Sequence, residues 1–145
     1  VTLYLFYYFL IMNEYYYKGR NILYGIMFAI VVLQLYSDYI DETPLKFRLI
    51  RFSLLFIFFT LVLKGYAWSK WIISIYLVLI GAGGILIGVY LIKNSNVLPE
   101  NFKSGIFAGL AGGLYVAFSL TILISKNIKN YLSQQREKRV ANKNN

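Results

Sequence analysis

The segment Gly105–Ser125, GIFAGLAGGLYVAFSLTILIS, decides the fold class of this chain. It holds twenty-one residues without a charge, and as a helix it is long enough to cross the ~30 Å hydrocarbon core of a bilayer. Small residues recur at every fourth position along it, at Gly105, Gly109, Gly113 and Ala117. Small side chains let two helix backbones approach closely in lipid. The segment therefore predicts a membrane-spanning helix that packs along this line.

The preceding apolar segment, residues 71–92, has glycines of its own. They are Gly81, Gly83, Gly84 and Gly88. If the two segments form an antiparallel hairpin, Gly88 pairs with Gly109 and Gly84 pairs with Gly113. We expect these glycines to serve helix packing within the chain. The alternative is a glycine zipper between subunits that lines a pore.

The composition extends this interpretation to the whole chain. Of its 145 residues, 59% are hydrophobic and 14% are charged, against roughly 25% charged in an ordinary soluble domain. The sequence thus predicts an all-α polytopic transmembrane bundle of four to five spans in tandem hairpins. The expected spans are 3–17, 22–40, 45–63, 71–92 and 105–125, forming one transmembrane domain (1–125) before a basic cytoplasmic tail (126–145). Residues 3–17 form either a short first span or an interfacial helix.

Two short basic segments are expected to be turns. In Lys18-Gly19-Arg20-Asn21, Gly19 can take the positive φ that ends one helix, and Asn21 can cap the next. The second is KGYAWSK at residues 64–70.

The second turn resembles a hairpin motif, K-G-x-x-W-A-R, found in many small uncharacterised bacterial membrane proteins. Lys64, Gly65 and Trp68 match the motif, whereas Ser69 and Lys70 replace its Ala and Arg. The first turn keeps only its Lys18 and Gly19, with Ile22 in place of the tryptophan. The resemblance implies two helical hairpins in tandem and carries no chemical activity.

A few polar residues fall within or beside the expected spans. Gln34 is expected to join helices by hydrogen bonding, and Asp38 lies near the exit of its span. Arg51 is expected to extend to the interface with its charge in water, the alternative being a transport or sensing role. The expected interface anchors are Trp68, Trp71, Arg51 and Lys64.

Charge sets the expected orientation. With five spans, residues 18–21, residues 64–70 and the tail share one side and hold ten basic residues, against five on the other. The richer side belongs in the cytoplasm, so the carboxyl terminus is expected there and the amino terminus outside. We expect the basic tail to contact anionic lipid headgroups, because nothing in it resembles a nucleic-acid-binding motif.

The residues that usually carry chemistry are scarce. The chain has no histidine and no cysteine, and its six acidic residues fall near span ends or outside them. The sequence therefore offers no catalytic residue, no metal ligand set and no cofactor site, and it predicts a protein that is not an enzyme. It also argues against a proton-coupled exporter, which needs a buried carboxylate.

Three functions remain from the sequence. The first is an accessory or immunity-type membrane protein that acts by helix packing on other membrane proteins or on itself. The alternatives are an oligomeric holin-like pore or small transporter, and a membrane enzyme acting on lipid, for which no catalytic set is visible. The abundance of Ile, Lys, Asn and Tyr suggests a low-GC bacterium, hence a bacterial plasma membrane.

Overall fold

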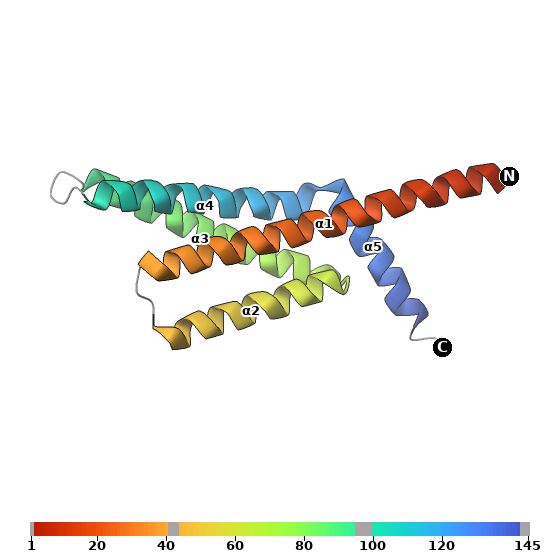
Figure 1. Cartoon of the computed structure of the whole chain (residues 1–145), viewed down its shortest axis with the longest axis horizontal. Coiled ribbons are helices and arrows are strands. Elements are labelled where there is room, and N and C mark those ends of the chain that lie inside the picture. The colour runs from red at the N-terminus through yellow and green to blue at the C-terminus, as the bar shows by residue number, and fades with distance from the viewer. Residues whose placement is uncertain (1, 41–43, 95–99, 143–145) are drawn as a thin grey trace. The chain divides into compact units, whose positions relative to one another are not determined.

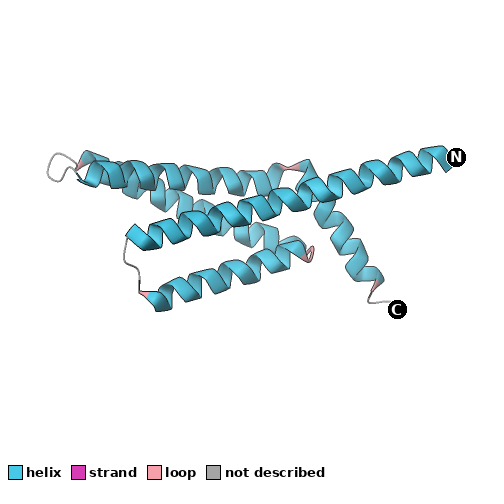
Figure 2. Ribbon diagram, in the orientation of Figure 1, coloured by secondary structure: helices cyan, strands magenta, loops and turns pink. Residues whose placement is uncertain are grey.

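A computed structural model of the chain describes residues 2–40, 44–94 and 100–142, and within them it contains helices and no strand (Figures 1 and 2). For residues 2–13, 15, 39, 40 and 100 only the backbone is described. The helices are α1 (Thr2–Ile40), α2 (Leu45–Leu63), α3 (Ala67–Lys93), α4 (Glu100–Ile124) and α5 (Lys126–Ala141). The predicted all-α class is confirmed.

The chain divides into two compact units. The first comprises Val1–Trp71 together with Ile122–Asn145, and the second comprises Ile72–Thr121. The first unit therefore contains α1, α2 and α5, together with the amino-terminal end of α3 and the carboxyl-terminal end of α4. The second contains the rest of α3 and α4, joined through a connection that lies outside the described residues.

Three helical segments among the described residues are long and apolar enough to cross a membrane. They are Tyr16–Asp38, Ala67–Lys93 and Asn101–Ile124. Large hydrophobic side chains on them are exposed, for example Phe28 (71%) and Leu110 (67%). Surface of this kind is what lipid covers. The fold is therefore compatible with a small integral membrane protein.

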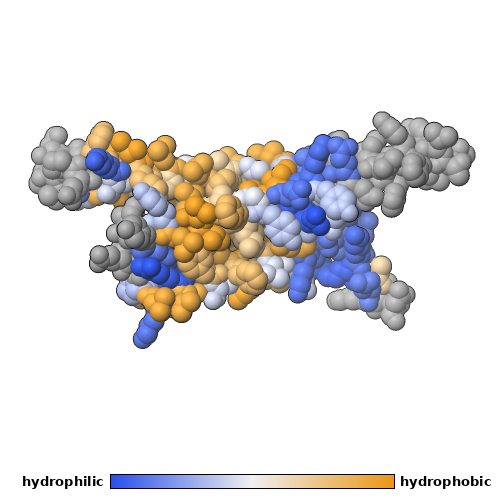
Figure 3. Space-filling view, in the orientation of Figure 1, coloured by the Kyte–Doolittle hydropathy of each residue, from blue (hydrophilic) through white to orange (hydrophobic). Residues whose placement is uncertain are grey.

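Helix α2 matches the predicted segment 45–63 but is not among these three. Its first turns carry Lys46, Arg48 and Arg51, so its uncharged part is too short to cross a bilayer. Hydrophobic side chains cover its middle, and hydrophilic ones gather where it begins (Figure 3). Its buried residues are Leu55, Phe59 and Val62.

The turn expected at residues 18–21 does not exist, because α1 runs unbroken through this segment (Figure 1). Lysine and arginine favour helices, and one glycine costs a helix only about 1 kcal/mol. The ion pair from Lys18 Nζ to Glu14 Oε1 (2.5 Å) also spans the segment at i,i+4 spacing. The first predicted hairpin, 3–17 with 22–40, is therefore a single helix.

The second expected turn is present between α2 and α3. Gly65 has a φ of +76°, the left-handed conformation that favours glycine. Its N–H donates to Val62 O (2.9 Å), and the N–H of Tyr66 donates to Leu61 O (3.2 Å). These two bonds form a Schellman motif, which satisfies carbonyls left unpaired at the end of α2.

The basic tail forms a separate helix rather than a continuation of α4. Ser125 interrupts the helix, because its ψ of 119° is not helical. It also caps α5, since its side chain accepts a hydrogen bond from Ile128 N. Figure 1 shows α5 crossing α1. Ile128, Tyr131 and Leu132 of α5 are buried. The tail is thus part of the core of the first unit.

Candidate functional site

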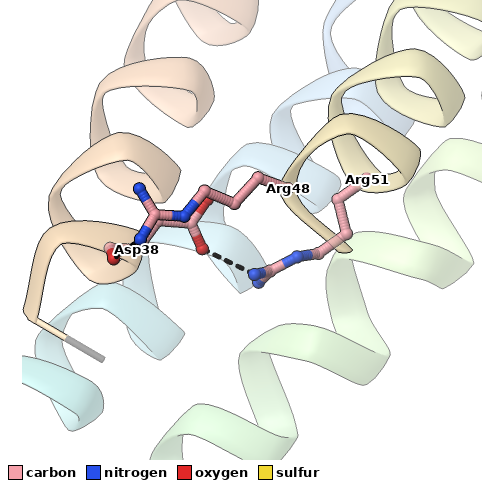
Figure 4. A network of polar contacts seen from close by, with 3 residues as sticks. All are labelled: Asp38, Arg48 and Arg51. Atoms are coloured by element: carbon pink, nitrogen blue, oxygen red, sulfur yellow. Dashed lines mark hydrogen bonds and ion pairs between the residues drawn. The ribbon is translucent and has the colours of Figure 1, made fainter. Parts of the chain in front are cut away.

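A cluster of charged side chains, Asp38, Arg48 and Arg51, joins the end of α1 to the start of α2 (Figure 4). Arg51 Nη2 lies 2.5 Å from Asp38 Oδ1, and Arg48 Nη2 donates to the backbone carbonyl of Asp38 at 2.8 Å. The Asp38 side chain is only 2% exposed, while that of Arg51 is 37% exposed. A carboxylate taken out of water in this way needs a cation beside it.

Local helix physics explains why both arginines come to Asp38. Asp38 lies in the last turn of α1, where carbonyls lack helical partners and the helix dipole disfavours a negative charge. Arg48 satisfies one such carbonyl, and Arg51 neutralises the carboxylate. The two arginines are three residues apart in α2, so they share one helix face.

This arrangement gives Arg51 a partner that the sequence did not predict. That Arg51 extends to the interface stays a prediction, and the structure adds that Arg51 pairs with Asp38. Asp38 lies at the end of its span as expected, but it is buried there. The pattern that could have indicated the pair is an acidic residue closing one helix, followed by two basic residues opening the next.

Gln34 lies one helical turn before Asp38 and is 5% exposed. Its Oε1 is buried and accepts no hydrogen bond from the described residues. The expected interhelical hydrogen bond is therefore absent at this oxygen. An open, mostly apolar pocket of about 350 Å³ lies between α1 and α2, and Gln34 does not line it. Its lining residues are Met27, Ile30, Val31, Phe52, Ser53, Leu55, Phe56 and Phe59.

A second cluster forms where α5 crosses α1 and the α2–α3 turn. A Cβ placed on Gly19 would collide with Asn127 O and would lie 2.8 Å from Tyr131 Cβ. One placed on Gly65 would lie 2.7 Å from Gln135 Cβ. Gly19 therefore serves close helix packing rather than the turn predicted for it.

Tyrosines connect the three elements of this cluster. Tyr131 donates a hydrogen bond to Leu63 O (2.9 Å), and Gln135 Nε2 donates one to Tyr16 OH (2.7 Å). The rings of Tyr16 and Tyr131 lie 5.0 Å apart. Burial, with a smaller effect of neighbouring Tyr16, raises the pKa of Tyr131 to about 12.

Replacing Tyr131 by phenylalanine should destabilise the protein by about 1 kcal/mol at neutral pH, because Leu63 O loses its donor. The unfolded chain releases the phenolic proton near pH 10, whereas the folded protein keeps it until about pH 12. Stability from this group is thus present below pH 10 and is lost as the pH rises towards 12. Thermal melting from pH 9 to 12 measures this loss, at most about 2–3 kcal/mol.

The Tyr131→Phe variant should lack this component of the pH dependence. Tyr90→Phe is the matched control, because the Tyr90 side chain is 66% exposed. Parallel melting curves of wild type and Tyr131→Phe across this range would contradict the role given to Tyr131.

The glycines of α3 and α4 meet within the second unit. A Cβ on Gly88 would lie 2.7 Å from Gly105 O and from Gly109 N, and one on Gly81 would lie 2.7 Å from Gly112 O. A Cβ on Gly84 would lie 3.2 Å from Gly112 Cα. Backbone therefore approaches backbone along this contact, with Ser119 donating a hydrogen bond to Ser74 O (3.0 Å) beyond it.

The register differs from the expected one in its second half. Gly84 faces Gly112 rather than Gly113, and a Cβ on Gly113 would meet nothing within 4 Å. Ala117 is exposed. At 3.6 residues per turn, a four-residue spacing drifts by about 40° at each step, so a line from Gly105 leaves the packed face by Gly113. A Cβ on Gly109 would also meet nothing within 4 Å, although its backbone lies against Gly88.

The expected interface anchors lie apart from these contacts. Trp68 and Trp71 are 50% and 55% exposed, and Lys64 is exposed. Lys70 Nζ lies 5.4 Å from the centre of the Trp71 ring. Half-exposed tryptophans beside lysines at the start of a span suit the membrane interface.

Among residues 2–40, 44–94 and 100–142, no three acidic side chains converge as a metal site would require. Comparison of the chain with known protein families, with curated proteins and with solved structures gave no match.

Proposed function

We propose that the chain is a non-catalytic integral membrane protein that acts by helix packing, as an accessory subunit or immunity-type protein. The observation that carries this proposal is that its polar contacts link its own helices. Arg51 binds Asp38, Tyr131 binds Leu63 O and Ser119 binds Ser74 O. These groups hold a scaffold together, while large apolar side chains face outward. We propose no enzymatic activity, cofactor or nucleic-acid partner.

Photo-crosslinking in the native membrane tests this role. A photoreactive phenylalanine at Leu110 or Phe28, both outward-facing, should yield a protein adduct of defined mass that copurifies in fixed stoichiometry from mild detergent. The partner is other membrane proteins or a second copy of the chain. Lipid adducts alone at both positions would contradict the accessory role.

A small transporter is the second candidate, and the buried carboxylate of Asp38 favours it. Ionisable residues within membrane-spanning segments often mark transport pathways. Asp38→Asn in proteoliposomes separates the two functions: a transporter loses flux of its substrate, whereas an accessory protein keeps its crosslinked partner. The pore alternative receives less support, because Gly81, Gly84 and Gly88 already face α4 of the same chain. Dye leakage from liposomes that carry the pure protein would support the pore function instead.

We propose a multi-pass protein of a bacterial plasma membrane with a cytoplasmic carboxyl terminus. Support comes from the first unit, where Gly19 of α1 and Gly65 of the basic turn both contact the basic helix α5. A cysteine replacing Ser95 should react with an impermeant thiol reagent added outside intact cells, and one replacing Asn142 should react only after lysis. The reverse labelling pattern would refute this orientation.

A further inference from the structure

Most of the positive charge of the chain gathers at one end of the first unit. This basic end is formed by the Lys18–Arg20 part of α1, the start of α3 with the turn before it, and α5. Its basic residues are Lys18, Arg20, Lys64, Lys70, Lys126, Lys129, Arg136, Lys138 and Arg139. With Glu14 and Glu137, these nine give a net formal charge of +7, out of +9 for the whole chain.

The carboxylates of the basic end are already engaged. Glu14 pairs with Lys18, and Glu137 accepts a hydrogen bond from Ser133 (3.5 Å). Neither of these two interactions involves an arginine of the basic end. The positive charge is thus largely uncompensated from within this end.

Two arginines of the basic end have buried donors without an acceptor. Arg20 Nε and Arg139 Nη1 are both buried, and neither has a hydrogen-bond partner among the described residues. Each guanidinium is held over a tyrosine ring, Arg20 at 5.0 Å from Tyr17 and Arg139 at 4.0 Å from Tyr66. A guanidinium held over an aromatic face by cation–π attraction keeps its N–H groups, which lie in the guanidinium plane, as hydrogen-bond donors. Buried donors without an acceptor are rare in proteins, so both arginines are under-satisfied within the chain. Both residues are only half-buried, so the rest of each guanidinium can reach an acceptor from outside.

The position of these arginines indicates which acceptor they meet. Helix α5 crosses α1 at Gly19, near the start of the span Tyr16–Asp38, and it also reaches Gly65 in the turn. A helix placed across the ends of spanning segments lies at headgroup level. Phosphate oxygens are the acceptors found there, and a guanidinium binds them in a bidentate manner.

We propose that Arg20 and Arg139 bind phosphate groups of anionic phospholipids at the membrane surface. The Tyr17 and Tyr66 rings restrict where the two guanidinium groups lie, so each arginine offers a placed set of donors instead of a mobile charge. The neighbouring lysines add attraction for anionic headgroups without setting a geometry. The basic end is therefore a structured lipid site built from α1, the turn and α5, which distinguishes it from a flexible polybasic tail.

The test is native mass spectrometry of the full-length protein in nonionic detergent, titrated with phosphatidylglycerol or phosphatidylcholine. We expect selective binding of phosphatidylglycerol, and Arg20→Gln and Arg139→Gln should each weaken it about tenfold or more. Lys129→Gln is the matched control, because it removes one exposed charge from the same end. Lys129→Gln should lower the affinity for phosphatidylglycerol at most about fivefold. The loss should be smaller at about 0.5 M salt, because salt screens diffuse electrostatic attraction.

Two further arms make the result decisive. Arg139→Lys keeps the charge but not the fork, so it should lose more affinity than Lys129→Gln. It also replaces Arg139→Gln if that variant does not fold, which thermal melting in the same nonionic detergent reveals. Inorganic phosphate at equal ionic strength should not displace the lipid. Displacement by it would identify a free-phosphate site instead, and arginine variants that behave like Lys129→Gln would overturn the proposal.

Discussion

Replacing Arg51 by methionine is expected to lower the free energy of unfolding by about 3 kcal/mol, because it leaves the Asp38 carboxylate buried without its cation. The carboxylate is 2% exposed and cannot turn to water, whereas Arg51 is 37% exposed. Asp38→Asn should therefore cost less, about 1 kcal/mol, since the remaining guanidinium can reach solvent or headgroups. Detergent denaturation followed by Trp68 and Trp71 fluorescence measures both values.

The double variant Asp38→Asn/Arg51→Met completes the cycle. It should be more stable than Arg51→Met alone, because the uncompensated charge is gone. Lys46→Met removes an exposed cation from the first turn of the same helix and controls for the general effect of charge. Equal losses for Arg51→Met and Lys46→Met, or strictly additive losses in the cycle, would show that the ion pair contributes little.

Replacing Gly112 by alanine is expected to make the protein about 1–3 kcal/mol less stable than the neighbouring replacement Gly113→Ala. A Cβ on Gly112 would lie 2.5 Å from Gly81 O and 2.8 Å from Ile85 N, so α3 and α4 must separate. A Cβ on Gly113 would meet nothing within 4 Å. The same change one residue away should therefore be neutral, or slightly stabilising through helix propensity.

Thermal melting of the two variants in identical micelles gives this difference directly. Gly83→Ala on α3 is a second control, because its Cβ also points to open space. Gly113→Ala could instead dissociate an oligomer without changing the melting temperature. That result would favour the glycine zipper between subunits. Equal melting temperatures for Gly112→Ala and Gly113→Ala would refute the α3–α4 register.

The turns show where sequence patterns suffice and where they do not. KGYAWSK gives a turn because Gly65 takes the left-handed conformation that ends α2. Lys18-Gly19-Arg20-Asn21 shares its first two residues, yet it is helical. A glycine at a helix end and a glycine at a helix crossing look alike in sequence, and the contact with α5 distinguishes them only in space.

In the candidate sites too, the sequence shows the residue types, and only the structure shows which residues meet. Asp38 and Arg51 were both visible as charged residues near span ends, but their pairing depends on how α1 and α2 face each other. The basic composition of the tail is evident from the sequence, whereas the contact of the Arg139 guanidinium with the Tyr66 ring requires α5 to fold back onto the turn. Pairwise contacts between distant segments leave no periodic signal in one sequence.

The amino-acid sequence alone determined the helical class, the apolar segments 71–92 and 105–125, the turn at Gly65 and the small residues available for packing. Length, charge and glycine conformation are local properties, so they can be read along the chain. Only the tertiary structure decided that Gly112 faces Gly84, that Arg51 meets Asp38, and that α5 crosses α1 at Gly19. These contacts depend on helix rotation and crossing, which local propensity does not fix.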